Sequence, residues 1–213
     1  MDNKDIVIVG YGGHAKSIAD AIESTKQYRI VGYTDFEDFQ DSDYKYLGTD
    51  DILTDLFKED VRYAIIGLGN MGNSSVRNKI YHMLRDIGYQ LPVIIDQSAV
   101  VSSKATIQPG TFVGKNAIIN AYAHVGKNCI INTGAIIEHE CEIGDGTHIA
   151  VGTVLCGQCV VGEDSLIGAN STVIQCKSVG KNTIIGAGSV VTTDIADNVI
   201  AVGTPAKVIK ENG

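Results

Sequence analysis

The sequence predicts an α/β domain followed by an all-β parallel β-helix. In residues 5–95, short apolar runs alternate with helical patterns, which is typical of βαβ units and a parallel sheet. From Ile95 onward, an aliphatic residue recurs at every sixth position, which is the period of a hexapeptide-repeat β-helix. The 213 residues therefore divide into a Rossmann-like domain of residues 1–95 and a β-helix of residues 96–213.

The first domain begins with a strand, a glycine turn and a helix. DIVIVG at residues 5–10 is a short buried strand, and Ile18, Ala19 and Ile22 share one face of a helix at residues 13–24. The elements expected next are a strand at 29–35, a loop at 37–42, a short helix at 51–57, a strand at 63–69 and a helix at 73–86 capped by Asn73 or Ser74.

The second domain is defined by its six-residue step. Three hexapeptides make one triangular coil, so residues 18 apart stack on one face, separated by the strand spacing of about 4.8 Å. The aliphatic residues at this step, which we expect to point inward, are Ile95, Val101, Ile107, Val113, Ile119, Val125, Ile131, Ile137, Ile143, Ile149, Leu155, Val161, Ile167, Val173, Val179, Ile185 and Val191.

Two further positions of the repeat have a restricted composition. Glycine is frequent one place after the aliphatic residue, where we expect a sharp corner and a positive φ angle. Four places after it the side chain is small, as in Ala117 and Ala135, because the interior is narrow. Cys129, Cys141 and Cys159 occupy this small inward position and are interpreted as packing residues.

Composition and charge exclude several classes of protein. The 17 Lys and Arg against 25 Asp and Glu give a net charge of −8, which argues against nucleic acid and against an anionic membrane surface as partners. No apolar stretch approaches 18 residues and the N-terminus lacks a signal-peptide pattern, so we expect a cytoplasmic protein with no membrane insertion. The five cysteines are an odd number and hold a single CxxC pair, Cys156 and Cys159, whereas a zinc ribbon needs two such pairs; this favours reduced thiols over a disulfide framework or a zinc ribbon.

Unusual polar residues break the repeat at IEHECEIGDGTH, residues 137–148. A neutral imidazole is the natural general base near pH 7, and a flanking carboxylate sets its tautomer and raises its basicity. His139 lies between Glu138 and Glu140, and Gly157 lies one coil beyond it, where a backbone N–H could face an oxyanion. A zinc site from His139, His148 and Cys141 is disfavoured because Cys141 should face inward, and no metal is expected.

The N-terminal motif GYGGHAK, residues 10–16, follows a strand and opens a helix. Its GxGxxA spacing, with Asp35 about 20 residues on, indicates a phosphate-bearing ligand at a helix N-terminus. The domain is too short for a full dinucleotide fold, so a mononucleotide is favoured, although a nucleotide-binding or oxidoreductase module stays an alternative. A second glycine turn at residues 67–73 leads to Arg77, which either faces a phosphate or pairs with an acid.

Both domains together resemble the bacterial nucleotide-sugar acetyltransferases. This family includes N-acetyltransferases of UDP-4-amino-sugars, GDP-perosamine N-acetyltransferases and sialic acid O-acetyltransferases. The resemblance covers nearly the whole chain and rests on GYGGHAK, GYTD, the hexapeptide run, NTGAIIEHEC at 132–141 and VGTPAKVI at 202–209. It implies a left-handed β-helix and a homotrimer, with acetyl-CoA in a groove between neighbouring β-helices and active sites between subunits.

The resemblance also implies roles for individual residues. His139 would be the general base and Glu140 would raise its basicity. The acetyl-CoA contacts would be His148, Gly157, Ala169 and Ala187. Asn132 would lie near the acceptor sugar, and the nucleotide-sugar pocket would contain Gly12, Gly13, His14 and Asp35. The family often has a second acid after Asp35, whereas this chain has Phe36, which leaves the base and the sugar open.

We therefore expect an acetyl-CoA-dependent N-acetyltransferase that acts on the amino group of a UDP- or GDP-linked amino-deoxy sugar. The acceptor amine would attack acetyl-CoA directly, with no acyl-enzyme. An O-acetyltransferase of a sugar such as sialic acid is the nearest alternative, and a non-catalytic nucleotide-binding module is the second.

Overall fold

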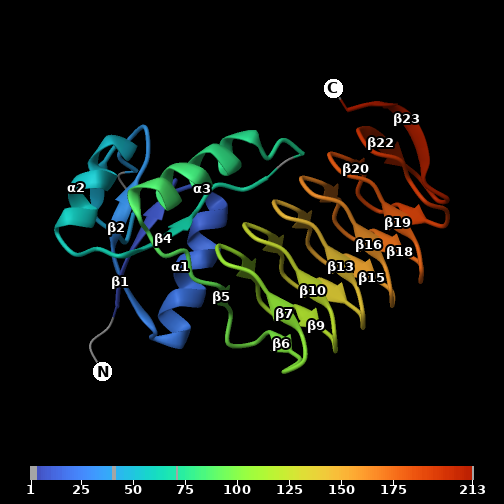
Figure 1. Ribbon diagram of the computed structural model, residues 1–213, viewed down its shortest axis with the longest axis horizontal. Coiled ribbons are helices and arrows are strands. Elements are labelled where there is room, and N and C mark those ends of the chain that lie inside the picture. Colours follow the sequence, from blue (N-terminus) through green and yellow to red (C-terminus); the bar gives the residue numbers. More distant parts are fainter. Residues whose placement is uncertain (1–3, 40–41, 71, 213) are drawn as a thin grey trace.

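The first domain of the computed structural model is a parallel sheet flanked by helices (Figure 1). The structure describes residues 4–39, 42–70 and 72–212, so positions 40–41 of the predicted loop lie outside it. The sheet has the order β3-β2-β1-β4, which is one half of a doubly wound fold. Its strands are β1 (Lys4–Val9), β2 (Tyr28–Thr34), β3 (Tyr46–Gly48) and β4 (Tyr63–Ile66).

The helices confirm the predicted pattern with small shifts at their ends. They are α1 (Gly13–Thr25), the 3-10 helix η1 (Asp50–Ile52), α2 (Leu53–Lys58) and α3 (Ser75–Ile87). The short edge strand β3 was not expected from the sequence. At the start of α3 the Asn73 carboxamide accepts the N–H of Ser75 at 3.0 Å, whereas Ser74 makes no side-chain cap.

The second domain is a parallel β-helix whose strands are two residues long and pair with strands 18 residues away. Three sheets form its faces, and we name each by one of its strands: the β11 sheet, the β12 sheet and the β13 sheet. The coil strands are β5 (Ile94–Ile95), β6 (Val100–Val101), β7 (Thr106–Ile107), β8 (Phe112–Val113), β9 (Ile118–Ile119), β10 (His124–Val125), β11 (Ile130–Ile131), β12 (Ile136–Ile137), β13 (Glu142–Ile143), β14 (His148–Ile149), β15 (Val154–Leu155), β16 (Val160–Val161), β17 (Leu166–Ile167), β18 (Thr172–Val173), β19 (Ser178–Val179), β20 (Ile184–Ile185) and β21 (Val190–Val191). The antiparallel pair β22 (Val199–Val202) and β23 (Lys207–Glu211) follows the last coil.

The predicted interior of the β-helix is confirmed. The aliphatic residues from Val113 to Val191 are buried, and Ile95, Val101 and Ile107 pack against them at the N-terminal end of the stack. The small inward position is buried too, including the three cysteines assigned to packing. Because the interior between the three sheets is narrow and closely packed, one position of each hexapeptide holds an aliphatic side chain and the other a small one.

The expected positive φ of the glycines that follow the aliphatic residue is wrong. The left-handed conformation lies two places later, at Asn116, Asn128, Gly134 and corresponding residues of other coils. The glycines are needed for another reason, since a Cβ on Gly144 would lie 2.4 Å from the backbone nitrogen of Glu163 in the next coil. Close backbone approach between coils, rather than chirality, selects glycine there.

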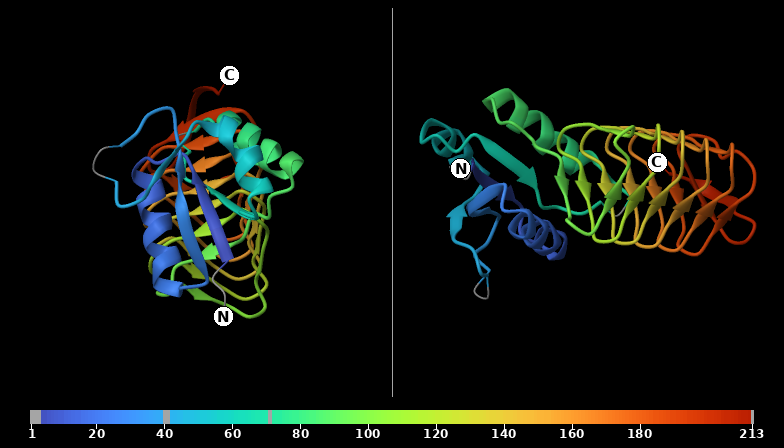
Figure 2. Two further views of the ribbon diagram at one scale, coloured as in Figure 1. Left: turned by 90° about the vertical axis from the view of Figure 1, so that its left-hand side faces the viewer. Right: turned by 90° about the horizontal axis from the view of Figure 1, so that it is seen from below.

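The α/β domain packs against the first coils of the β-helix (Figure 2). Ile94, Phe112 and Ile130, the outward residues of the β11 sheet, join the apolar core around α1. Arg77 of α3 is buried and donates to the carbonyls of Ile66, Leu68 and Asn128 and to the Asn128 side chain. Neither predicted role of Arg77 is correct, because its guanidinium binds backbone carbonyls and an amide across the domain boundary.

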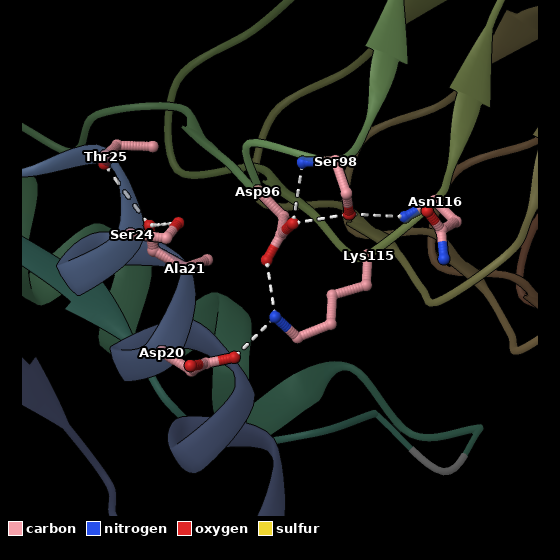
Figure 3. A network of polar contacts seen from close by, with 8 residues as sticks. All are labelled: Asp20, Ala21, Ser24, Thr25, Asp96, Ser98, Lys115 and Asn116. Atoms are coloured by element: carbon pink, nitrogen blue, oxygen red, sulfur yellow. Dashed lines mark hydrogen bonds and ion pairs between the residues drawn. The ribbon is translucent and has the colours of Figure 1, made fainter.

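A second polar connection joins α1 to the first coils (Figure 3). The Lys115 ammonium lies 2.6 Å from Asp20 of α1 and 3.2 Å from Asp96 after β5. Asp96 is buried and also accepts the hydroxyl and the N–H of Ser98. Ser98 in turn accepts the N–H of Asn116 from the next coil. These contacts fix the orientation of α1 relative to the β-helix.

Candidate active site

His139 lies at the corner of the coil between the β12 and β13 sheets. His139 Nδ1 lies 3.1 Å from the Glu140 carboxylate, to which it donates, so the lone pair of the neutral ring is on Nε2. Both side chains are about half exposed, at 54% and 52%. Orientation of one ring nitrogen by a carboxylate leaves the other free to accept a proton from a ligand in solvent.

Gly157 lies directly over the His139 ring. A Cβ at Gly157 would be 2.5 Å from His139 Nε2, a distance that only a glycine hydrogen can accommodate. The N–H of Gly157 donates to no acceptor among the described residues, whereas its carbonyl accepts from Cys176 in the next coil. The corner therefore offers a proton acceptor and a free backbone donor side by side.

Two residues that hold this cluster were missed in the sequence. Gln158 donates to the Glu140 carboxylate at 3.2 Å, and Asn120 donates to Glu138 at 2.9 Å. Each lies 18 residues from its partner, so the stacking rule itself was the signal that could have found them. Glu140 has φ of +58°, and the residues at the same position of the next two coils, Gln158 and Cys176, have φ of +61° and +57°, so this conformation belongs to the turn of the repeat.

A pocket of about 620 Å³ lies on the other side of the chain, between the α/β domain and the β11 sheet. It brings together all five residues predicted to bind the nucleotide sugar, and also His148. Its lining consists of Gly10, Tyr11, Gly12, Gly13, His14, Ser17, Asp35, Phe39, Gly67, Leu68, Gly69, Asn70, Asn132 and His148. A Cβ at Gly12 or Gly13 would meet no atom within 4 Å, so these two residues leave open space in front of the α1 N-terminus.

The glycine turns that form this pocket allow close backbone packing and leave the N-terminus of α1 open to a ligand. Gly10 has φ of +83° and Gly67 crosses it so closely that a Cβ at Gly67 would lie 2.1 Å from the Gly10 carbonyl oxygen. Asp35 accepts the N–H groups of Tyr11 and Phe36 at 2.7 and 2.6 Å, which ties the end of β2 to the loop before α1. The turn is thus built for close backbone packing, and α1 begins with uncapped N–H groups that suit an anion.

The two histidines of the pocket are neutral. His148 is buried, its Nδ1–H donates to the Asn70 carbonyl at 2.6 Å, and its Nε2 accepts from the Asn132 amide at 3.3 Å. Burial lowers the pKa of His148, with the Arg77 charge acting in the same direction. Burial, with Arg77 and His148 nearby, lowers the pKa of His14 to about 3. His14 Nε2 is buried and has no hydrogen-bond partner among the described residues.

The predicted acetyl-CoA contacts do not gather in one place on the chain. Gly157 shares the corner of His139, whereas Ala169 and Ala187 follow β17 and β20 at the corner between the β11 and β12 sheets. His148 lies inside the pocket with Asn132, not beside His139 as their closeness in sequence suggested. The pocket and the His139 corner lie at opposite ends of the β12 sheet strands.

The remaining candidate residues have structural surroundings. Cys141 is fully buried and its thiol donates to the Cys156 carbonyl at 3.2 Å, so it cannot share a metal with exposed His139. Cys156 is half-buried and Cys176 is exposed. His124 shares a 2.6 Å hydrogen bond with Thr106 on the neighbouring coil. Within residues 4–39, 42–70 and 72–212, no helix has the length and apolar character needed to cross a bilayer.

Comparisons with known proteins agree with this architecture. The PglD N-terminal domain matches residues 5–84, the bacterial transferase hexapeptide matches residues 140–175, and the hexapeptide repeat of succinyl-transferase matches residues 105–139, 158–193 and 177–200. UDP-N-acetylbacillosamine N-acetyltransferase of Bacillus subtilis is 36% identical over 114 residues. That alignment spans 52% of this chain and about half, 51%, of the curated relative.

Two solved structures match nearly the whole chain at 31% identity. One is a histidine-to-alanine variant of GDP-perosamine N-acetyltransferase from Caulobacter crescentus in complex with CoA and GDP-perosamine, with a TM-score of 0.91 and 97% of each chain covered. The other is the acetyltransferase domain of PglB from Neisseria gonorrhoeae, with a TM-score of 0.90 and 97% and 100% covered. The predicted left-handed β-helix is thereby confirmed. The chain belongs to the hexapeptide-repeat acetyltransferase family that contains GDP-perosamine N-acetyltransferase and the PglB acetyltransferase domain.

Proposed function

We propose that the protein transfers the acetyl group of acetyl-CoA to the amino group of a UDP- or GDP-linked amino sugar, with His139 as general base. The amine nitrogen attacks the thioester carbon while His139 Nε2 takes the proton from nitrogen. The tetrahedral oxyanion is stabilised by the Gly157 N–H, and collapse breaks the carbon–sulfur bond. The proton on His139 then neutralises the CoA thiolate.

One observation carries this proposal. His139 has its Nδ1–H fixed by Glu140, while its Nε2 lies against a glycine whose N–H is free. A base and an oxyanion donor at one solvent-accessible corner are what acyl transfer to an amine requires. The related GDP-perosamine enzyme, whose structure holds CoA and GDP-perosamine, supports the choice of donor and acceptor class.

The test is acetyl transfer to a panel of UDP-, GDP- and CMP-linked sugars, with release of free thiol as the readout and product mass as identification. Removal of a general base costs about 10²–10⁴ in rate, so His139→Ala should lose that much. His124→Ala is the matched control, because His124 is a partly exposed histidine of the same β-helix. Full activity of folded His139→Ala would remove the assignment, and acetylation of hydroxyls alone would replace the amine acceptor by an alcohol.

We further propose that each active site lies between two copies in a homotrimer. The outward residues of the β12 sheet form a mostly aliphatic ladder of Val100, Ile118, Ile136, Val154, Thr172 and Val190. Most of these side chains are only half-buried in the single chain, and Val100 is 63% exposed. Packing this ladder against a second copy would bury apolar surface and bring the His139 corner of one copy to the pocket of another.

In this arrangement acetyl-CoA lies in the groove between neighbouring β-helices. One copy contributes Gly157 beside the thioester, and the other contributes Ala169 and Ala187 at its opposite corner. His148 acts from the pocket of about 620 Å³, which we call the acceptor pocket, and it orients Asn132 toward the sugar. Gly12, Gly13, His14 and Asp35 hold the nucleotide part.

Complementation tests the shared site. His139→Ala removes the base of one copy, and Gly12→Phe places a large side chain into the pocket of another, because a Cβ at position 12 meets no atom within 4 Å. Mixed oligomers purified through two different affinity tags should recover activity that neither variant has alone. Absence of recovery in a confirmed mixed oligomer would place a complete site within one chain.

A further inference from the structure

A second pocket of about 420 Å³ adjoins the acceptor pocket. The two share Gly10, Asp35 and Leu68, so one extended ligand can occupy both. The remaining lining residues come from the end of β2, from the loop around η1 and from α3, namely Phe36, Thr49, Asp50, Asp51, Val76, Lys79 and Ile80. The sequence motifs assigned a binding role to none of these residues. Phe36 was noted only because the family often has an acid at this position.

The charges of this second pocket exclude the phosphates of a nucleotide. Asp35, Asp50 and Asp51 line it against a single cation, Lys79, so a pyrophosphate would meet net repulsion there. The phosphates fit instead at the uncapped N-terminus of α1, next to Gly12 and Gly13. The second pocket is therefore available to the uncharged end of a nucleotide sugar, the nucleoside.

The apolar groups of the second pocket suit a planar ring. Leu68, Val76 and Ile80 supply aliphatic contact, and the Phe36 side chain is 93% exposed at the rim. An aromatic ring in this position gains from stacking on a base, which is worth about 1–3 kcal/mol per base. Asp50 is held in place by the Thr34 hydroxyl, which donates to one of its oxygens at 2.6 Å and leaves the other free.

We propose that the second pocket binds guanine and that Phe36 stacks on it, so the acceptor is a GDP-linked sugar; this rests on the proposed function. Guanine presents adjacent N–H donors at N1 and N2, which match a carboxylate of Asp50 or Asp51, and a carbonyl at O6, which matches Lys79. Uracil places its single N–H between two carbonyls, and carboxylates repel the second carbonyl.

The test is calorimetric titration of the purified protein with GDP, UDP and CDP. GDP should bind at least tenfold more tightly than UDP, and Asp51→Asn should narrow that ratio. Phe36→Ala should weaken GDP binding about tenfold to a hundredfold, which corresponds to the stacking range, and Phe36→Tyr should retain it. Tyr122→Ala is the matched control, because Tyr122 is an exposed aromatic residue on a β-helix turn.

The outcomes separate this inference from the proposed function. Tighter binding of UDP than of GDP, or unchanged GDP binding in Phe36→Ala, would overturn the guanine assignment and leave the acetyltransferase proposal in place. Failure of all three nucleotides to bind, with the protein folded, would overturn both. Acetylation of a UDP-linked amino sugar with no turnover of its GDP counterpart would also refute the guanine assignment alone.

Discussion

Gly157→Ala should disable the base without removing it. The added Cβ would lie 2.5 Å from His139 Nε2 and 2.6 Å from Cε1, whereas ordinary van der Waals contact begins near 3.4 Å. The imidazole must therefore move by about 1 Å. A misplacement of about 1 Å costs about 10²-fold in rate, or about 2.7 kcal/mol in transition-state free energy. The N–H at position 157 is retained in the variant, so the loss reports on the ring position.

The assay is thiol release at saturating acetyl-CoA, with thermal unfolding as the check on folding. The same substitution in the His139→Ala background should cost less than about threefold, because the ring that it displaces is gone. A single variant with full activity would refute the reasoning. An equal hundredfold loss in both backgrounds would show that Gly157 acts independently of His139.

Three further predictions concern stability. The pKa of His14 is 6.5 in the unfolded state and about 3 in the folded state, so between these pH values the unfolded state binds more protons. The contribution of His14 to the free energy of unfolding is therefore fully present above pH 6.5 and is lost as the pH falls toward 3. The free energy of unfolding should decline by up to about 1.4 kcal/mol per pH unit as the pH falls, and denaturant titrations of His14→Gln should show a flatter pH profile than those of the unchanged protein. Lys115→Ala should lower the free energy of unfolding in urea by about 1.5–3 kcal/mol, because buried Asp96 loses a charged donor. Lys58→Ala, which breaks an exposed pair with Asp55, should lower it by less than about 1 kcal/mol, and equal effects of the two substitutions would contradict the connecting role of Lys115. Gly144→Ala should prevent close stacking on Glu163 and lower the melting temperature well beyond the effect of Ala117→Gly, and an unchanged melt would show that the coils can separate there.

The six-residue period carried most of the architecture. It predicted the buried aliphatic residues and the packing role of Cys129, because both depend only on repeating geometry. The positive φ angles were predicted at the wrong position of the repeat. A glycine that is required because a neighbouring backbone leaves no room for a Cβ cannot be told in sequence from a glycine that is required for a positive φ. The pairing of Glu140 with Gln158 was readable from the 18-residue register and was overlooked.

The contacts between the two domains could not be predicted in this way. Arg77 binds the carbonyls of Ile66 and Leu68 and the Asn128 side chain, and no local pattern links α3 to a coil about 50 residues later. The same holds for Asn70, whose carbonyl fixes the tautomer of His148. The position of His148 in the acceptor pocket follows from domain packing, so its nearness to His139 in sequence was misleading.

The repeating coil also sets how the chain can change in length. Because residues 18 apart pair on the same face, removal or insertion of one whole coil returns every later side chain to its own face. A change of six residues instead turns everything beyond it by one face of the prism. The α/β domain contacts the β-helix from Lys115 of the early coils as far as Asp164, which accepts from Asn78 of α3, so the distance from these contacts to any later coil changes only in steps of about 4.8 Å. Under the proposed function, acceptor sugars of different size would therefore be accommodated by the loops of the α/β domain, because the spacing between the coils of the β-helix is fixed.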